Sequence, residues 1–419
     1  MSSLPDFYHD RQDVSSLPKG LYEELRDHYL IMPDDQKVTF TGMVLTDSGI
    51  SIFLPRNSSI ESYKGAAGLR YASLLMKGLR RYLKDRTNQE LDNDGDGFIG
   101  GAQFSVITDL LDDYCTHGLY TQRFSEQVTN SGKPDWRRTV ASNVAFPGDL
   151  GPVYLDIFGT RQRYISDCEV ARIHASIIRE LDQSYSWIIT GSSIPVAQGI
   201  EGVPLSVVDK DTKISILERE LISVYSEREI RLINLLIKYI KNTHGRRSSE
   251  LIGMRHFHSM WESMLDSSLK WVFPVNRLLA IPAYRFNDNS LLPAATKGQR
   301  TDTVMKHPID KRFVVVDAKY YGAHDVKSAP GWGDIVKQFF YAKALKIFSE
   351  NAEVDNVFIF PGNGPLRSIH MQDRKSKAPL LDQDYPPIRC VYIDPMTLLE
   401  HYVSGIKLED LSNQLMLSR

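Results

Sequence analysis

The chain has 419 residues, of which 42% are hydrophobic and 24% charged, and its 50 basic and 52 acidic residues give a formal net charge of −2. Such a composition is ordinary for a soluble globular protein, and the length is too great for one compact core, so we expect two domains. The near-neutral charge is no evidence for or against a nucleic-acid partner, because an enzyme needs only a local basic groove.

The cysteines and the hydropathy of the sequence indicate the cellular compartment of the protein. Cys115, Cys168 and Cys390 are far apart and form no CxxC pair, which argues against a zinc ribbon or a disulfide framework and favours a reduced compartment. The polar N-terminus lacks the apolar run of a signal peptide, and the longest apolar stretch, near residues 232–240, is too short to span a bilayer. We expect a cytoplasmic protein with no membrane partner.

The first half of the chain predicts a mixed α+β domain over residues 1–205, which we expect to serve DNA recognition or partner contact. Residues 38–54 have the pattern of a hairpin. Helices are expected at 68–86, 104–115 and 169–181, and a strand followed by a loop at 186–199. Glycines and prolines between Gly191 and Pro204 predict the domain boundary.

The second half, residues 206–419, predicts an α/β domain. A helix is expected at 214–240, and another that starts at Ser248 or Ser249. Short apolar runs then follow (LLAIPAY, TDTVM, FVVVDAKYY, VFIFPG and CVYID), with the amphipathic segment DIVKQFFYAKALKIFSE between the third and the fourth. This order predicts a mixed sheet flanked by helices.

One strand of this sheet ends in charged residues. Phe313 to Val316 are four apolar residues in a row, as in a strand buried on both faces, and Asp317, Ala318 and Lys319 follow. Side chains alternate along a strand, so Asp317 and Lys319 point to the same side. An acid and a base placed in this way can share one metal and phosphate site.

A second carboxylate is expected beside the first. Asp302 opens the preceding short strand, and the intervening turn KHPIDK predicts antiparallel pairing of the two strands. Two carboxylates aimed at one point repel each other unless a hard divalent cation holds them together. Such an ion activates water and stabilises charge on a phosphate, and Lys319 would orient or deprotonate that water or neutralise the transition state. The alternative is a strand-end ion pair of Asp317 with Lys319, with Asp302 as a turn residue.

This arrangement resembles the PD-(D/E)XK nuclease superfamily, with Thr301 and Asp302 in the place of the PD motif and Asp317-Ala318-Lys319 as the DXK motif. Four segments are similar to the nucleases of LlaJI-type and McrC-type restriction systems. They are DAKYY, FHSMWESML, PGWGDIVKQFFYAKAL and TFTGMVLTDSGISIFLP. The resemblance is clearest over residues 254–361. Thr301 departs from the usual proline, which has a structural and not a chemical role.

The resemblance implies roles for four further residues. Glu262 would assist the metal site, and Lys337, Gln338 and Tyr341 would face the site and the DNA. Each has a plainer interpretation, since a glutamate of an amphipathic helix is ordinarily solvated and Gln338 can belong to a polar helix face. Lys337 and Tyr341 are four residues apart and share a face if the segment is helical.

The segment at 92–103 resembles a calcium-binding loop. Asp92, Asp94 and Asp96 stand at its positions 1, 3 and 5, with glycine at position 6. Position 12 is Gln103, whose neutral side chain cannot close the coordination sphere as a glutamate does. The loop is therefore either a structural Ca²⁺ site or an acidic surface turn.

The function that these features predict is that of a Mg²⁺-dependent endonuclease of the restriction type acting on double-stranded DNA. Each site cuts one strand, so a double-strand break requires a homodimer, a partner restriction subunit or sequential nicks. Relatives of the LlaJI and McrC kinds act beside a GTP-hydrolysing motor, which here would be a separate chain because no GxxxxGK[ST] loop occurs. The alternatives are a DNA repair or recombination nuclease, a DNA-binding subunit without cleavage, and a calcium-regulated interaction protein.

Overall fold

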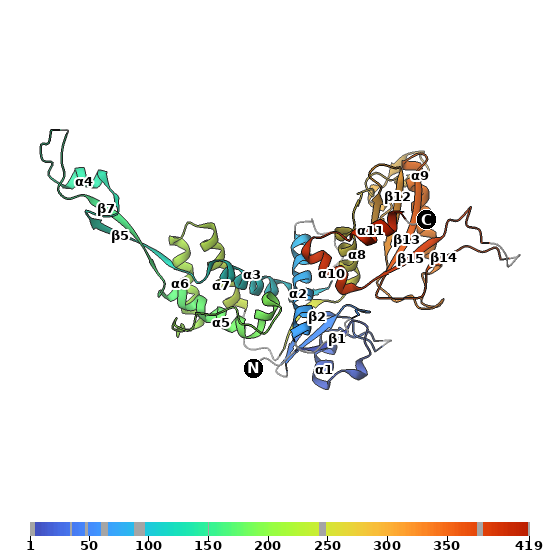
Figure 1. Ribbon diagram of the computed structural model, residues 1–419, viewed down its shortest axis with the longest axis horizontal. Helices are drawn as coiled ribbons and strands as arrows, with labels where there is room; N and C mark the ends of the chain where they lie inside the picture. Colours follow the sequence, from blue (N-terminus) through green and yellow to red (C-terminus); the bar gives the residue numbers. More distant parts are fainter. Residues whose placement is uncertain are drawn as a thin grey trace. The chain divides into compact units, whose positions relative to one another are not determined.

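The computed structural model confirms an α/β protein (Figure 1). It describes residues 5–33, 36–46, 49–59, 66–87, 97–149, 151–242, 249–374 and 380–417. Asp92, Asp94 and Asp96 of the predicted calcium loop lie outside these ranges. Within them, no helix is both long and apolar enough to cross a membrane.

The C-terminal sheet is mixed, as predicted. Its strands are β11 (Thr303–Lys306), β12 (Arg312–Ala318), β13 (Glu353–Pro361), β15 (Ile388–Ile393) and β14 (Ser368–Ile369), in this spatial order. β12, β13 and β15 run parallel, and the two outer strands are antiparallel to their neighbours. The central strands are buried on both faces, which explains their continuous apolar runs.

Helices pack on this sheet and beside it. They are α8 (Phe257–Ser268), α9 (Trp332–Phe348), α10 (Pro395–Ser404) and α11 (Glu409–Leu417). On one face of β12, Phe313 and Val315 form a core cluster with Ala344 and Leu345 of α9. Asp317 and Lys319 follow Val315 at two-residue steps and therefore point to the same face as α9.

A second five-stranded sheet confirms the predicted N-terminal hairpin. Its spatial order is β1 (Asp6–His9), β3 (Gly49–Leu54), β2 (Thr41–Thr46), β8 (Ser249–Met254) and β4 (Phe98–Ile99). The short helices η1 (Val14–Ser16) and α1 (Lys19–Asp27) precede the hairpin, and α2 (Ala66–Thr87) follows it. α1 contributes Leu21 and Leu25 to a core cluster with Phe40 and Phe53.

The expected helix start at Ser248 or Ser249 is wrong. Ser249–Met254 is strand β8, and the helix begins only at Phe257. β8 lies between β2 and β4, and Gly253 faces Gly42 across the β2–β8 pair. A Cβ atom on Gly253 would lie 2.4 Å from the carbonyl oxygen of Thr41, so this close strand pairing requires glycine.

The middle of the chain is mainly helical. It holds α3 (Gly101–His117), α5 (Glu169–Thr190), α6 (Lys210–Ser223) and α7 (Glu227–Asn242). The strand expected from residue 186 is wrong, because Trp187 and Ile188 continue the buried face of α5. The single helix expected at 214–240 is divided into α6 and α7, which the described residues 224–226 separate.

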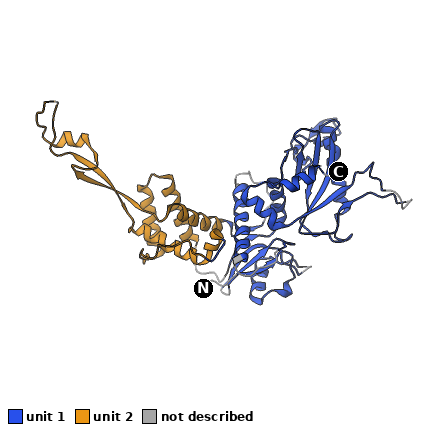
Figure 2. Ribbon diagram, in the orientation of Figure 1, with its two compact units in different colours: residues 1–101, 191–193, 247–419 blue, residues 102–190, 194–246 orange. Residues whose placement is uncertain are grey.

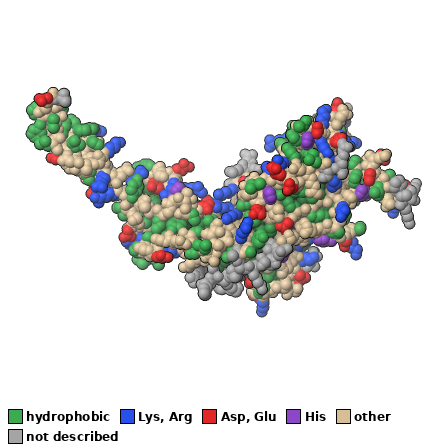
Figure 3. Space-filling model, in the orientation of Figure 1, with side chains coloured by type: hydrophobic (Ala, Val, Ile, Leu, Met, Phe, Trp, Pro, Cys, Tyr) green, Lys and Arg blue, Asp and Glu red, His purple; other side chains and the backbone are tan. Residues whose placement is uncertain are grey.

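A long arm extends from these helices (Figure 1). β5 (Gln122–Thr129) and β7 (Phe158–Ile165) pair antiparallel along its length, β6 (Lys133–Pro134) pairs with β7, and α4 (Trp136–Ser142) lies near its far end. Hydrophobic side chains gather on its surface (Figure 3). Those exposed include Phe124, Trp136, Val144, Phe146 and Leu155.

The chain divides into two compact units (Figure 2). Unit 1 comprises residues 1–101, 191–193 and 247–419, and unit 2 comprises residues 102–190 and 194–246. This division differs from a boundary between residues 205 and 206. The pairing of β8 with β2 explains why the N-terminal sheet belongs to the same unit as the C-terminal one.

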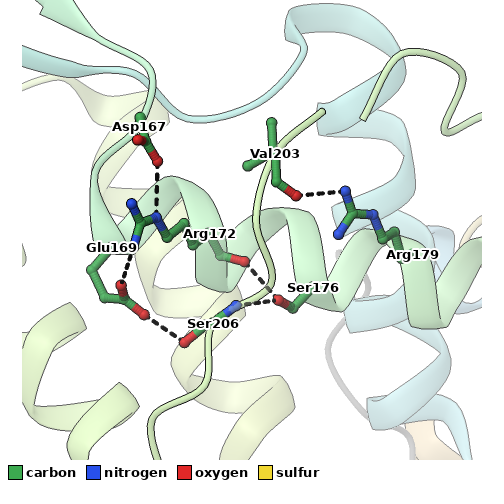
Figure 4. Close-up of polar contacts among 7 residues, drawn as sticks. All are labelled: Asp167, Glu169, Arg172, Ser176, Arg179, Val203 and Ser206. Carbon is green, nitrogen blue, oxygen red and sulfur yellow. Dashed lines mark hydrogen bonds and ion pairs between the residues drawn. The ribbon is translucent and has the colours of Figure 1, made fainter. Parts of the chain in front are cut away.

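The glycine- and proline-rich segment after α5 is tied to that helix and is not an open linker (Figure 4). Arg179 donates a hydrogen bond to the carbonyl oxygen of Val203 at 2.7 Å. The Ser206 amide donates to Ser176 Oγ at 3.0 Å, and the Ser206 hydroxyl donates to Glu169 Oε1 at 2.6 Å. These bonds account for the inclusion of residues 194–209 in unit 2.

Candidate active site

The structure brings Asp302 and Asp317 together. β11 and β12 pair antiparallel with Thr303 opposite Val316, so Asp302, just before β11, lies opposite Asp317. The amide of Ala318 donates a hydrogen bond to Asp302 Oδ2 at 2.8 Å. Asp302 therefore directly precedes the strand that the sequence analysis expected it to open, and the predicted proximity of the two carboxylates is confirmed.

The surroundings of Asp302, with Asp317 close by, favour the protonated form of its carboxyl group. Desolvation by the surrounding protein, a hydrogen bond with Asp317, and repulsion by Asp317 and Glu262 together raise the pKa of Asp302 to about 8. Its side chain is nevertheless accessible to solvent. The raised pKa favours the protonated form of Asp302 at neutral pH, in which it can form a hydrogen bond with Asp317.

Glu262 reaches this pair from α8. The apolar side chains of that helix, among them Met260, Trp261 and Met264, are buried, and Glu262 is half-buried at the edge of the same packed face. Burial and repulsion by Asp317 raise the pKa of Glu262, and attraction by Lys319 opposes the shift. The carboxyl group of Glu262 is therefore within electrostatic range of both Asp317 and Lys319.

Lys319 is held between two carboxylates. Its Nζ lies 2.9 Å from Asp317 Oδ2 and 2.8 Å from Asp334 Oδ1, and its side chain is only 14% exposed. Burial alone would lower the pKa of Lys319, but Asp317 and Asp334 reverse this effect and raise it above its ordinary value. Lys319 is therefore a fixed cation at neutral pH.

Asp334 is not among the residues that the sequence predicts for this site. This residue lies in the first turn of α9, where an acid also complements the helix dipole. That role alone explains an aspartate at this position, so nothing in the local pattern marks it as part of the site. Its identification depends on the packing of α9 beside the end of β12.

The other predicted α9 residues occupy different environments. Gln338 is fully buried, and within the described part of the chain neither polar atom of its side chain has a hydrogen-bond partner. Tyr341 is half-buried and donates a hydrogen bond to the carbonyl oxygen of Arg300 at 2.9 Å, and its pKa is raised by burial and by Asp317 and Asp302. Lys337 is exposed to solvent. Tyr341 thus lies beside the carboxylates, whereas Lys337 lies on the solvent side of the helix.

Tyr320 anchors the end of β12. The backbone amide of Arg56 donates a hydrogen bond to the Tyr320 hydroxyl at 2.9 Å. The same hydroxyl bonds to Asp10, whose pKa burial raises to about 6 against the attraction of Arg11 and Arg56. The N-terminal sheet therefore holds the residue that directly follows Lys319.

The donor set suits a hard divalent cation with few protein ligands. Over the described residues, no group of three or more His, Cys, Asp or Glu side chains is arranged to hold a metal ion. Mg²⁺ commonly uses one or two carboxylates and completes its coordination with water and substrate phosphate. Asp302 and Asp317 fit that requirement, and a cation would take the place of the proton that the raised pKa of Asp302 favours.

Comparison with known proteins identifies the family. The sequence profile described as LlaJI restriction endonuclease matches residues 40–373. A curated relative, the type II restriction enzyme BsuMI component YdjA of Bacillus subtilis (strain 168), is 24% identical over 316 residues, which cover 70% of this chain and 67% of the relative.

Two solved structures are also similar in part. A half-complex of Thermococcus gammatolerans McrB AAA+ hexamers with bound McrC has a TM-score of 0.42 at 11% identity, covering 97% of this chain and 99% of that one. The Thermococcus gammatolerans McrBC complex has a TM-score of 0.26 at 10% identity, covering 62% and 85%. Both scores are too low to establish a shared fold. The profile match over most of the chain, by contrast, shows that this protein belongs to the LlaJI restriction endonuclease family.

Proposed function

We propose that this restriction-type nuclease is a Mg²⁺-dependent, site-specific deoxyribonuclease that cleaves double-stranded DNA at the Asp302–Asp317–Lys319 site. The observation that carries the proposal is the convergence of the Asp302 and Asp317 carboxyl groups at adjoining strand ends, beside the ammonium group of Lys319. A structural ion pair needs one carboxylate. Two converging carboxylates, with Glu262 in electrostatic range, are costly without a further function.

In this proposal Asp302 and Asp317 hold the ion, and Glu262 adds negative charge near it. A bound divalent cation supplies Lewis acidity, which lowers the pKa of water and offsets charge on the scissile phosphate. Lys319 stays protonated between Asp317 and Asp334, so it acts by stabilising developing negative charge and not as the base. Asp334 keeps the ammonium group oriented toward the site.

The curated relative is described as a component of a restriction enzyme, which favours dependence on a partner over a self-sufficient homodimer. The apolar side chains exposed on the arm of unit 2 are typical of a surface that binds another protein. We propose that the arm contacts a partner subunit, in line with the expectation of DNA recognition or partner contact outside the nuclease domain. A GTP-hydrolysing motor is one such partner. We also propose a cytoplasmic location, which suits three cysteines that form no disulfide with one another.

The test is incubation of the purified chain with supercoiled plasmid and Mg²⁺. Asp317→Ala should abolish cutting. Asp310→Ala is the matched control, because it removes a carboxylate from the turn of the same hairpin, where the side chain is 72% exposed. Equal cutting by the parent and Asp317→Ala would exclude the proposed site.

Four further outcomes would distinguish the alternatives. Discrete bands from unmodified linear DNA indicate a restriction enzyme, and structure-dependent cutting indicates a repair or recombination nuclease. Cutting that begins only when a second protein is supplied indicates a dependent subunit. A chain that binds DNA but does not cut under any of these conditions would support the non-cleaving alternative.

A further inference from the structure

The residue before Asp302 is held by an asparagine 25 positions earlier in the chain. Asn276 Oδ1 accepts hydrogen bonds from the Thr301 amide at 2.9 Å and from the Thr301 hydroxyl at 2.8 Å. Asn276 Nδ2 donates to the Thr301 carbonyl oxygen at 2.9 Å. One side-chain amide therefore binds both backbone groups and the side chain of Thr301.

We propose that Asn276 is a positioning residue for metal binding, which fixes the backbone at Thr301 and thereby holds the Asp302 carboxylate in place. In the nuclease motif that this segment resembles, proline stands where this chain has Thr301. Proline restricts its own φ to about −65° and has no amide N–H. The three hydrogen bonds between Asn276 and Thr301 restrain the same backbone by a different means. One of them needs the amide and another the hydroxyl, both of which proline lacks.

The backbone at this point requires an external restraint. The ladder between β11 and β12 begins with the Thr303–Val316 pair, so residues 301 and 302 lie before it. On the other side of Asp302, Thr303 is held by the ladder and by a hydrogen bond from its hydroxyl to Asp266 Oδ1 at 2.9 Å. Asp302 therefore lies between two residues that are each held by hydrogen bonds, Thr301 and Thr303. Asn276 provides the restraint on Thr301, the N-terminal one of the two.

Asn276 is itself firmly placed. The segment before it runs antiparallel to β11, with a bridge between Val272 and Met305 and a hydrogen bond from the Phe273 amide to the Val304 carbonyl oxygen at 2.7 Å. Val275, the residue directly before Asn276, is 1% exposed and belongs to the core cluster under β12. The backbone that carries the Asn276 side chain is therefore held in place by the sheet and the core.

The proposal depends on the proposed metal site, and a double-mutant cycle tests it. Mn²⁺ binding to the full chain without DNA is measured by calorimetry for the parent, Asn276→Ala, Thr301→Pro and the double variant. Loss of a group that orients a metal ligand typically weakens binding by about 10–100-fold, and we expect this for Asn276→Ala. Thr301→Pro in the double variant should restore affinity to near that of the parent, because proline restrains the backbone without the asparagine.

A purely structural role would not give this rescue. Both substitutions break the same contact, so the double variant would then be about as weak as Asn276→Ala. Unchanged Mn²⁺ affinity in Asn276→Ala, or a double variant at least as weak as Asn276→Ala, would overturn the proposal. If Asn276→Ala does not fold, Thr301→Val replaces it. That variant removes only the hydroxyl bond at constant shape, and a loss smaller than tenfold is expected. An unchanged affinity would count against the proposal.

Amide hydrogen exchange separates this inference from the proposed function. The amides of Asp302 and Thr303 should exchange faster in Asn276→Ala than in the parent, without any metal. If the parent binds no Mn²⁺ but this difference is present, the restraint exists and the metal site is wrong. If the parent binds Mn²⁺ and exchange is unchanged, the restraint is wrong and the metal site stands.

Discussion

Asp302→Asn tests the shared proton of the carboxyl pair. With the pKa of Asp302 raised to about 8, the parent pair carries one proton below that pH, and a divalent cation must displace it. One proton released per ion makes the apparent metal affinity rise about tenfold for each pH unit up to about pH 8 and level off above it. In the variant that proton is absent, so affinity should be weaker at pH 8 and nearly independent of pH.

The same substitution should stabilise the metal-free protein. The pKa of Asp302 is 3.8 in the unfolded chain and about 8 in the folded one, so its contribution to stability is full below about pH 4 and is lost as the pH rises toward 8. The neutral asparagine of the variant would have no such dependence. The melting temperature of the variant should therefore exceed that of the parent by an amount that grows from pH 5 to pH 8.

Both effects can be measured on one pair of proteins. Calorimetric titration with Mg²⁺ or Mn²⁺ at pH 6, 7 and 8 gives the slope of the logarithm of the metal affinity against pH. Thermal unfolding without metal at the same pH values gives the difference in stability between parent and variant. Asp310→Asn serves as a control for loss of an exposed carboxylate. Equal slopes for parent and Asp302→Asn, or a variant that melts below the parent at pH 8, would refute the shared proton.

Four further perturbations follow from contacts in unit 1. Lys319→Met should reduce cleavage by about 10²–10³-fold while metal binding persists, because the variant loses the group that stabilises developing negative charge. Asp334→Asn removes one of the two carboxylates that raise the pKa of Lys319, so the alkaline limb of the pH–rate profile should move to lower pH. An unshifted limb would show that Lys319 does not need its charge. Tyr320→Phe leaves an enclosed backbone amide without its acceptor and should cost about 1–3 kcal/mol in urea unfolding, whereas a neutral result would show that water replaces the hydroxyl. Gly253→Ala places a Cβ 2.4 Å from the carbonyl oxygen of Thr41 in β2. It should lower the free energy of unfolding by about 1–3 kcal/mol or more. Gly331→Ala, where a Cβ meets nothing within 4 Å, is its control.

The sequence alone was sufficient for the local elements of the site. The apolar run of β12 predicted a buried strand, and the alternation after it placed Asp317 and Lys319 on one side. The short turn before it predicted the β11–β12 hairpin and hence the position of Asp302. Such predictions succeed because partners close in sequence are paired by turn geometry and hydrophobic pattern, both of which are visible along the chain.

Other elements depended on partners far away in the sequence. β8 is a strand because it completes the sheet of β2, which lies some 200 residues earlier, and its local pattern did not distinguish strand from helix. Trp187 and Ile188 read as a strand but extend α5, because the rest of that helix face is already buried. The metal-free pair also differs from two free carboxylates, since burial and repulsion that only the folded chain supplies leave it with a proton.

Residue type and spacing therefore determined which groups can carry the chemistry, namely two aspartates and a lysine at adjoining strand ends. Only the tertiary structure determined how those groups are held, with Asp334 on Lys319 and Asn276 on the residue before Asp302. The physical reason is that a side-chain hydrogen bond between distant segments leaves no periodic trace in the sequence. It exists only when the packing of β12, α9 and the segment before β9 (Ala283–Arg285) brings its two partners within about 3 Å of each other.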